Sequence, residues 1–379
     1  MVELGSIANF INGFAFKPEH WEEDGKPIIR IQNLTDSSKS FNYSSMDIPE
    51  KYHVVKGDLL VSWSATLDVF EWHREDALLN QHIFKVEPNF AKVNKDYLRY
   101  ALRDAISAML KFTRGSTMKH VNRGDFLGTK IPLPPLETQK QIAAVLEKAD
   151  QLRKDCQQME QELNGLAQSV FIDMFGDQLT SPHDVLGNVS NVVSGVTKGQ
   201  KHNNKVIVKA PYMRVANVQA GYLNLNEIKE IEVKESDVEK YKLEVGDVLL
   251  TEGGDHDKLG RGAIWNGEVD NCIHQNHVFR VRLDTELYTS QWFNGYLKTD
   301  FAKRYFLKCA KKTTNLASIN ITQLKGLPMP DIDIKEQVRF EKIITSINSQ
   351  MLSNTELAHQ YDENFNALMQ KAFKGELNL

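Results

Sequence analysis

The amino-acid sequence predicts an α+β protein in which two similar domains with small curved β-sheets are separated by two long antiparallel coiled-coil helices. Three observations lead to this architecture. A long heptad pattern occupies the middle of the chain, the segments on either side of it resemble one another, and a second heptad pattern ends the chain. The expected division is a first domain over residues 1–135, a first helix over 136–176, a second domain over 177–333 and a second helix over 334–379.

The first helix is predicted by apolar residues that alternate three and four positions apart. Such a stripe packs against another helix as a coiled coil, and the charged and amide residues between its members suit a solvent-exposed face. Pro134 and Pro135 prevent the helix from extending backwards, and Gly176 can end it. The stripe is expected to contain Ile142, Val145, Ala149, Leu152, Cys156, Met159, Leu163 and Leu166.

A similar pattern near the end of the chain supplies the partner of the first helix. The first helix leads from domain one to domain two, and the second helix leaves domain two. If the helices pair along their length, they must therefore be antiparallel. A buried Asn, here Asn354, can fix the register of such a pair. The second stripe is expected to contain Phe340, Ile344, Ile347, Met351, Asn354, Ala358, Tyr361 and Phe365.

Segments of the first half recur in the same order in the second half, which indicates an internal duplication. Gly13 falls opposite Gly195 within this alignment. Each half contains short β-like runs that are punctuated by Gly, Asn and Asp, followed by a helical pattern, as expected for an α+β domain. The matching segments are residues 4–9 with 186–191, 27–34 with 211–218, 56–62 with 245–251, 81–86 with 276–281, and 131–134 with 327–330.

Positive charge concentrates at equivalent places in the two halves. Residues 99–123 carry Arg99, Arg103 and further cations, and residues 298–312 carry a second basic run. Basic patches of this kind are typical of surfaces that contact phosphate, although a solvated helix face is the alternative. A small polar loop follows each run, and its hydroxyls and amides suit phosphate and base-edge contacts.

Composition limits the class of protein. The 379 residues are 41% hydrophobic and 25% charged, which is typical of a globular protein with more than one domain. The net charge of −4 argues against nucleic-acid binding by overall charge alone. There is no run of apolar residues long enough to cross a membrane, and no secretory signal is visible. The three cysteines fit reduced thiols, so we expect a cytoplasmic protein.

The boundary between the first domain and the first helix carries a family resemblance. The segment 131–143 reads Ile-Pro-Leu-Pro-Pro-Leu-Glu-Thr-Gln-Lys-Gln-Ile-Ala, and a looser copy occurs at residues 327–337. A domain that ends in this way, followed by a long helix and then by the same plan again, resembles the DNA specificity subunit (S subunit) of type I restriction–modification enzymes. The resemblance spans the full chain.

The resemblance implies a function for the whole molecule. Each half would be a target recognition domain followed by a conserved spacer helix. The domains would each read one half of a bipartite DNA site, and the helix pair would set the spacer. The subunit would be non-catalytic and without a cofactor. It would dock two modification subunits, which use S-adenosylmethionine to methylate adenine, and two restriction subunits, which use ATP and Mg²⁺ to translocate and cut double-stranded DNA.

The candidate DNA contacts combine the basic runs, the polar loops and equivalent positions of the two repeats. Arg261, in a glycine-bounded loop, is a candidate base or phosphate reader. The full candidate set is Arg30, Ser62, Lys111, Arg114, Ser116, Thr117, Lys119, His120, Arg123, Arg214, Thr251, Arg261, Lys308, Lys311, Lys312, Thr313, Thr314 and Asn315.

Catalytic and metal-binding patterns were weighed against structural interpretations. The sequence contains no amino-methyltransferase motif of the Asn/Asp-Pro-Pro-Tyr/Phe type and no phosphate-binding loop, so neither methylation nor motor activity is expected. The segment 330–335 resembles a nuclease element, but Asp331 or Asp333 fits better as a helix N-cap. His274 with His277, and the segment 255–257, could be metal ligands, but a structural or DNA-facing role suits them better because no Cys or Glu cluster accompanies them.

Two other interpretations of the chain remain open at this stage. The first is a coiled-coil interaction protein whose domains bind other proteins. The second is a complete fused restriction enzyme, which the absent motifs oppose. Strong dependence of DNA binding on salt concentration distinguishes a DNA reader from a protein-binding scaffold.

Overall fold

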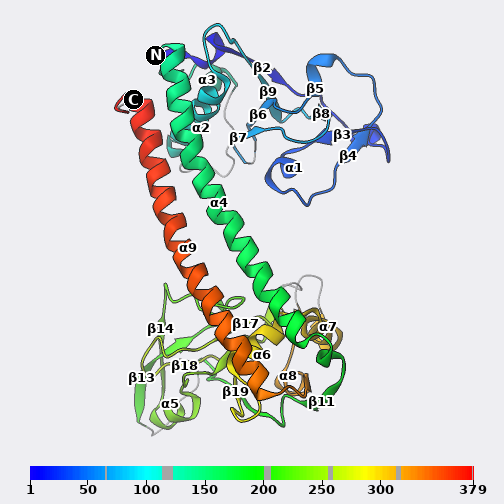
Figure 1. Cartoon of the computed structure of the whole chain (residues 1–379), viewed down its shortest axis with the longest axis vertical. Coiled ribbons are helices and arrows are strands. Elements are labelled where there is room, and N and C mark those ends of the chain that lie inside the picture. Colours follow the sequence, from blue (N-terminus) through cyan, green and yellow to red (C-terminus); the bar gives the residue numbers. More distant parts are fainter. Residues whose placement is uncertain (65, 113–122, 200–205, 255–258, 313–316, 378) are drawn as a thin grey trace. The chain divides into compact units, whose positions relative to one another are not determined.

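The computed structural model describes most of the chain and divides into two compact units. The positions that it does not describe are residues 65, 113–122, 200–205, 255–258, 313–316 and 378. Unit 1 comprises Met1–Gln157 and Glu356–Leu379, and unit 2 comprises Gln158–Thr355. Each unit therefore contains part of both long helices, α4 (Leu136–Phe175) and α9 (Ile334–Lys374) (Figure 1). Among the described helices, none is long and apolar enough to cross a membrane.

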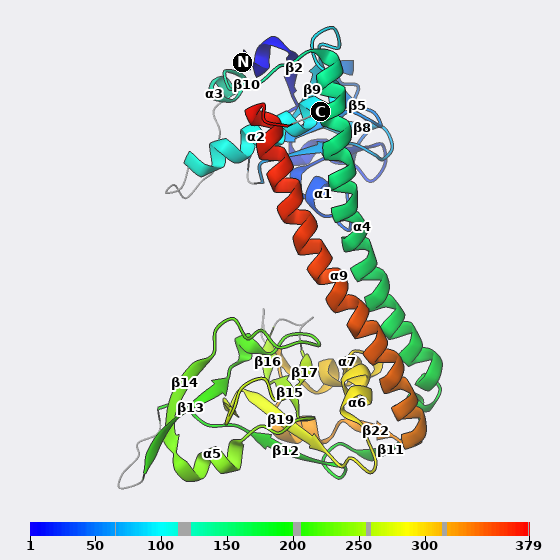
Figure 2. The same cartoon turned by 60° about the vertical axis from the view of Figure 1, so that its left-hand side comes forward.

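Unit 1 is built on two four-stranded β-sheets and one short strand pair (Figure 2). Its strands are β1 (Val2–Glu3), β2 (Ala8–Asn12), β3 (Lys26–Ile29), β4 (Asn42–Ser44), β5 (His53–Val54), β6 (Leu59–Ser62), β7 (Asp68–Glu71), β8 (Ala77–Leu79), β9 (Ile83–Pro88) and β10 (Lys130–Ile131). The first sheet is antiparallel and has the order β2-β9-β6-β7. The second has the order β4-β3-β8-β5, in which β3 and β8 are parallel. Strands β1 and β10 form the pair.

In the part of unit 1 that the structure describes, three helices accompany the long ones. They are α1 (Ile31–Thr35), α2 (Lys95–Phe112) and α3 (Arg123–Leu127). Helix α2 buries Leu98 and Leu102, which are four positions apart and so lie on one face of the helix. These residues join a core cluster that also contains Phe84 and Val86 of β9 and Leu146 of α4. The first turns of α4 therefore belong to the core of unit 1.

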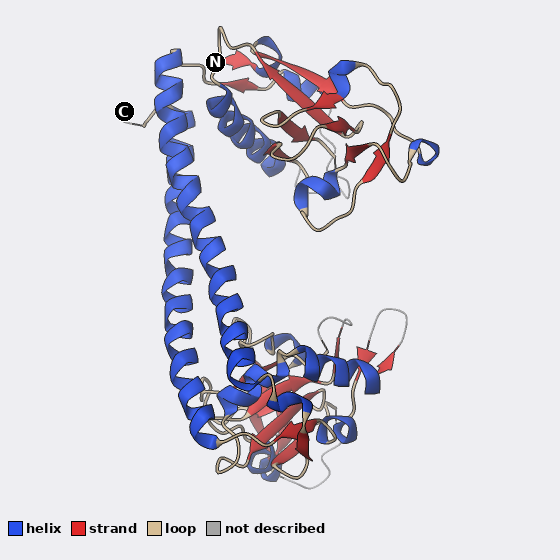
Figure 3. Cartoon of the chain, turned by 45° about the vertical axis from the view of Figure 1, so that its right-hand side comes forward, coloured by secondary structure: helices blue, strands red, loops and turns tan. Residues whose placement is uncertain are grey.

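Unit 2 repeats this plan with additional short strands (Figure 3). Its strands are β11 (Pro182–Val185), β12 (Ser190–Ser194), β13 (Ile207–Met213), β14 (Lys229–Lys234), β15 (Val248–Thr251), β16 (Gly253–Gly254), β17 (Gly262–Ile264), β18 (Ile273–His274), β19 (Val278–Leu283), β20 (Lys311–Lys312), β21 (Ala317–Ser318) and β22 (Pro328–Pro330). Its helices are α5 (Glu235–Tyr241), α6 (Ser290–Leu297), α7 (Asp300–Cys309) and α8 (Ile321–Lys325), besides its parts of α4 and α9.

Most strands of unit 1 have a counterpart in unit 2, apart from β5, and the sheet β16-β21-β20 belongs to unit 2 alone among the described residues. The order β12-β19-β15-β17 repeats β2-β9-β6-β7, and β14-β13-β18 repeats β4-β3-β8, including the parallel pair. The pair of β11 with β22 repeats that of β1 with β10. A Cβ atom on Gly13 would lie 2.2 Å from the Asn80 carbonyl oxygen, and one on Gly195 would lie 2.0 Å from that of His274, so both close approaches require glycine. The two similar α+β domains predicted from the repeated segments are confirmed.

The long helices pair in opposite directions. In unit 1 an early part of α4 meets a late part of α9, where Arg153 forms an ion pair with Asp362. In unit 2 the end of α4 meets the start of α9, where the Phe171 and Phe340 rings pack edge to face at 5.3 Å. Early residues of α4 thus meet late residues of α9, and late residues of α4 meet early residues of α9. The two helices therefore run in opposite directions, and the predicted antiparallel pairing is confirmed (Figure 1).

Three residues of the predicted α4 stripe are not buried. Val145, Met159 and Leu166 are exposed, whereas Leu146 is buried and Leu152 and Arg153 are both half-buried. The Arg153 guanidinium lies over the Phe365 ring at 4.5 Å. Ile142, Ala149, Cys156, Leu163, Phe340, Ile344, Ile347 and Phe365 are buried, and Leu152, Met351, Asn354, Ala358 and Tyr361 are half-buried. Val145, Met159 and Leu166 therefore lie outside the buried stripe of α4, and the other predicted stripe residues are buried or half-buried.

The packing of α9 in unit 2 predicts unequal effects of two truncations. Phe340→Ala removes a buried ring that contacts Phe171 and Phe175, so it should destabilise unit 2 by about 3–5 kcal/mol. Leu166→Ala, on the exposed side of α4, should change stability by no more than about 0.5 kcal/mol. Urea unfolding followed by circular dichroism measures both. Equal shifts of the unfolding midpoint would contradict the assignment of the buried row.

Candidate functional site

Two cations of the first basic run, buried Arg99 and half-buried Arg103, pair with carboxylates of unit 1. Arg99 of α2 is buried and forms ion pairs with Glu71 of β7 and Glu147 of α4. Arg103 lies 3.6 Å from the carboxylate of Asp150, which is itself buried. Burial acts to raise the pKa of Asp150, but the surrounding cations outweigh it, and the pKa is lowered. These arginines therefore hold α2 against α4, and the interpretation of the whole run as a free basic patch is wrong for them.

Many of the predicted contacts lie outside the part of the chain that the structure describes. They are Arg114, Ser116, Thr117, Lys119, His120, Thr313, Thr314 and Asn315. Lys111 is the second-last residue of α2 and Lys312 ends β20, but their side chains are also outside the description. The loops that follow both basic runs therefore stay predictions.

Three predicted cations lie on the surface of their units. Arg123 opens α3, is exposed, and donates a hydrogen bond from Nη2 to the Phe10 carbonyl oxygen at 3.0 Å. Lys308 near the end of α7 and Lys311 in β20 are exposed as well. Arg261, before β17, is half-buried and donates from Nη1 to Oε1 of Gln219 at 3.3 Å. The three exposed side chains are available to a polyanion.

Two predicted hydroxyl contacts are not available. Ser62 ends β6 and Thr251 ends β15, and both side chains are fully buried. The Ser62 hydroxyl accepts a hydrogen bond from the Asp68 amide at 3.2 Å and donates to the carbonyl oxygen of Thr66. Neither hydroxyl reaches the surface, so the expectation that they contact DNA is wrong for this structure.

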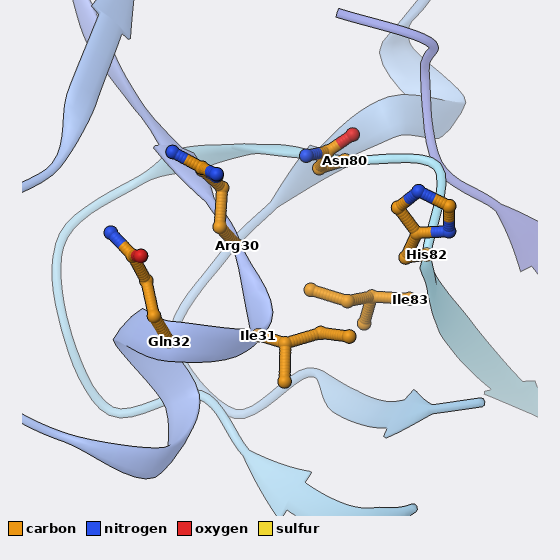
Figure 4. Close-up of a pocket in the computed structure, with 6 residues that line it drawn as sticks. All are labelled: Arg30, Ile31, Gln32, Asn80, His82 and Ile83. Carbon is orange, nitrogen blue, oxygen red and sulfur yellow. The ribbon is translucent and has the colours of Figure 1, made fainter. Parts of the chain in front are cut away.

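Arg30 and Arg214 occupy equivalent positions, one residue after the end of a sheet strand. In each unit a buried Asn fixes the turn that follows. Asn33 accepts a hydrogen bond from the Arg30 amide at 3.1 Å, and Asn217 accepts one from the Arg214 amide at 3.0 Å. The side chain of Arg30 lines a hollow of about 160 Å³ in unit 1 (Figure 4).

The other polar residues around this hollow were missed in the sequence. Gln32, Asn80 and His82 line it together with Arg30 (Figure 4). The signal that could have found two of them is the repeat itself. The matching segments 81–86 and 276–281 carry His82 and His277 at the same place, and Asn80 precedes the first segment as Gln275 precedes the second.

The proposed histidine metal pair has a structural explanation in unit 2. His274 is fully buried, its Nδ1 lies 2.7 Å from the Val278 carbonyl oxygen, and burial lowers its pKa to about 4. His277 is exposed and its Nδ1 pairs with the Glu252 carboxylate. Among the described residues no group of three or more His, Cys, Asp and Glu side chains could hold a metal. The alternative ligands in segment 255–257 lie outside the described chain.

The nuclease-like segment before α9 also has a structural role. The Asp333 carboxylate accepts a hydrogen bond from the Lys335 amide at 2.9 Å, and its carbonyl oxygen accepts from the amides of Glu336 and Gln337. These bonds satisfy the free donors at the start of the helix. The segment therefore begins α9.

Comparisons with known proteins agree with this architecture. A family model described as "Type I restriction modification DNA specificity domain" matches residues 1–164. The type I restriction enzyme EcoBI specificity subunit from Escherichia coli is 28% identical over 415 residues, which cover 99% of this chain and 85% of the relative. The StySPI specificity subunit from Salmonella potsdam is 24% identical over 413 residues, which cover 99% and 88%.

A solved structure of a specificity subunit shows that the likeness extends to the fold. The S subunit of a type I restriction–modification system from M. genitalium matches with a TM-score of 0.55 at 16% identity, covering 98% of this chain and 95% of that chain. In sequence and in fold, the chain matches the type I specificity subunits. The motif at residues 131–143 is thus part of a likeness that extends along almost the whole chain.

The buried His274 predicts how the stability of unit 2 depends on pH. Its pKa is lowered from 6.5 to about 4, so the unfolded chain takes up the proton first as the pH falls. Above pH 6.5 the protonation of His274 does not change the free energy of unfolding. As the pH falls from 6.5 to 4, it should lower that free energy by about 3 kcal/mol. Urea unfolding of the wild type and of His274→Asn, which keeps a donor for Val278, measures the difference. Parallel pH profiles of the two proteins would contradict the assignment.

Proposed function

We propose that the chain is the sequence-specific DNA-binding subunit of a type I restriction–modification complex and has no catalytic activity of its own. Each unit would read one half of a bipartite DNA site. The observation that carries this proposal is the duplication: two domains with the same strand order, each completed by a long helix, along a chain that resembles specificity subunits for 99% of its length. A duplicated reader is suited to a site with two separated halves.

The division of labour follows the repeat. We assign residues 1–135 and 177–333 to the two target recognition domains, and residues 136–176 and 334–379 to the spacer helices. Because α4 and α9 pair through buried side chains in each unit, the pair can act as a rigid spacer. Its length would then fix the number of base pairs between the two half-sites.

Partner subunits would bind the helix pair and complete the enzyme. In unit 2, Met159 and Leu166 lie seven residues apart on α4, and Ile172 follows, and all three are exposed. Exposed apolar side chains at heptad spacing suit contact with a helix of another protein. We assign this role to the modification subunits, expected in two copies, with two restriction subunits beyond them. S-adenosylmethionine, ATP and Mg²⁺ would be bound by those partners.

The exposed cations would increase the affinity for DNA of any base sequence. Arg123 in unit 1 and Lys308 and Lys311 in unit 2 are available to phosphates, and such contacts release counterions from DNA. Arg261 and the candidates outside the described residues stay in the proposed contact set. The net charge of −4 is consistent with binding that depends on local patches and on the partner subunits.

Methylome sequencing of cells that carry this gene with its companion modification gene tests the proposal directly. Methylated adenines should fall in a two-part sequence with a fixed spacer. A four-residue insertion after Met159, balanced by one after Asn354, lengthens both helices by about 6 Å and should increase the spacer by roughly two base pairs.

A matched control separates spacing from damage to the helices. Gln161→Ala changes another exposed position in the same part of α4 without altering helix length, so the spacer should stay the same. A two-part methylation site whose spacer is unchanged by the insertions would refute the spacer role of the helices. Methylation at a continuous site, or at no defined site, would refute the proposed function.

Removal of two exposed cations should weaken binding to every sequence. Lys308→Ala with Lys311→Ala removes two expected phosphate contacts, so the slope of log affinity against log salt should fall by about 2. DNA binding by the assembled complex at several salt concentrations measures this slope. Lys209→Ala with Lys240→Ala, exposed lysines of the same unit outside the basic run, is the control. Equal slopes for the two double variants would contradict the assignment.

A further inference from the structure

The hollow at Arg30 is placed by a feature of the sheet in unit 1. Strands β3 and β8 are parallel neighbours, with Ile28 opposite Leu78 and Ile29 opposite Leu79. Arg30 and Asn80 each follow one of these strands directly. The carboxyl ends of parallel neighbours meet at the same edge of a sheet, so the two polar side chains are brought together by backbone pairing.

The lining of the hollow combines an apolar floor with polar groups around it. Figure 4 shows the Ile31 and Ile83 side chains on one side, with the polar side chains distributed about them. A phosphate placed over these apolar side chains would lose hydrogen bonds to water, and the isoleucines offer no hydrogen bonds in their place. A nucleobase has apolar faces and a hydrogen-bonding edge, so it matches both parts of the lining. The polar residues are Arg30, Gln32, Asn80 and His82.

The Arg30 guanidinium is held in place but keeps its charge uncompensated. Its Nη1 donates to Oδ1 of Asn42 at 3.0 Å, and it lies over the Trp21 ring at 5.4 Å. No carboxylate of the described residues forms an ion pair with it. A neutral acceptor and an aromatic face orient the guanidinium without neutralising it, which leaves its remaining donors for a ligand.

The equivalent position in unit 2 shows the opposite electrostatics. Arg214 donates from Nη2 to the Glu227 carboxylate at 2.8 Å and to the Glu227 carbonyl oxygen at 3.0 Å. His277, the equivalent of His82, pairs with Glu252. In unit 1, by contrast, His82 packs against the Trp63 ring at 5.6 Å. The shared scaffold therefore presents an available guanidinium in unit 1 and a compensated one in unit 2.

We propose that the hollow in unit 1 is a nucleobase-reading site and that Arg30 selects guanine at one position of the half-site read by unit 1. An arginine fork donates to both O6 and N7 of guanine, and this pairing distinguishes guanine from the other bases. The inference rests on the proposed function, because it assigns one step of DNA recognition to one residue.

Binding of the assembled complex to a set of duplexes tests the assignment. The duplexes carry the methylome-defined site with each position of one half-site replaced in turn. Arg30→Gln should reduce discrimination at a single guanine-containing position by roughly 5- to 150-fold, with the salt dependence unchanged. Arg30→Lys should not restore it, because lysine lacks the planar fork. Replacing that guanine by 7-deazaguanine should weaken wild-type binding and leave Arg30→Gln unaffected.

Matched controls keep the outcome interpretable if Arg30 also supports the fold. Arg74→Gln alters another arginine of unit 1 that stacks on aromatic rings, at 5.3 Å from Phe41, but does not line the hollow, so it should leave every position unchanged. Undiminished discrimination at the other half-site, together with the same melting temperature, shows that the Arg30 variants are folded and assembled.

Two results would overturn the proposal. Uniform weakening at all sequences with a smaller salt slope would make Arg30 a phosphate contact. Unaltered discrimination at every position would remove Arg30 from recognition. In both cases the wild-type complex would still prefer its two-part site, whereas loss of that preference in the wild type would refute the proposed function itself.

Discussion

One buried glutamine in the first turn of each long helix fixes how that helix joins its domain. Gln139 accepts a hydrogen bond from the Asn94 amide at 2.8 Å and donates to the carbonyl oxygens of Lys92 and Pro134. Asn94 directly precedes α2, so the side chain ties the starts of two helices together. Gln337 makes the same three kinds of bond in unit 2, at the residue before α6. An apolar residue at either place would leave buried polar groups without partners. The glutamine of the motif at residues 131–143 is thereby explained physically.

The sequence predicted the repeated fold well because the matching segments of the two halves form, or flank, strands that pair with corresponding strands in each unit. It failed where a polar side chain lies inside the structure. Arg153 is half-buried on α4, where its guanidinium is held by Asp362 and the Phe365 ring. Arg99 was counted as surface charge, yet Glu71 and Glu147 hold it inside unit 1. Such ion pairs join residues that are far apart in the chain, so no local sequence pattern predicts them.

The candidate site was predicted only in part. Arg30 and Arg214 were found because both halves carry an arginine after the same strand, but Asn80 and His82, which share the hollow with Arg30, come from the turn after β8. Only the parallel pairing of β3 with β8 brings that turn beside Arg30. Ser62 and Thr251 were misassigned for the converse reason. A hydroxyl at the end of a strand resembles a surface residue in sequence, although both of these side chains are buried in the fold.

The duplicated scaffold separates what must stay constant from what can change. Asn33 and Asn217 make equivalent bonds to the chain after each arginine, so the turn is fixed whatever the arginine contacts. The partner of the guanidinium is then free to differ, and it is Asn42 in one unit and Glu227 in the other. A change from amide to carboxylate reverses the local charge balance without disturbing the strand pairing. Two copies of one fold can in this way present different donors and acceptors, which is what two unlike half-sites would require.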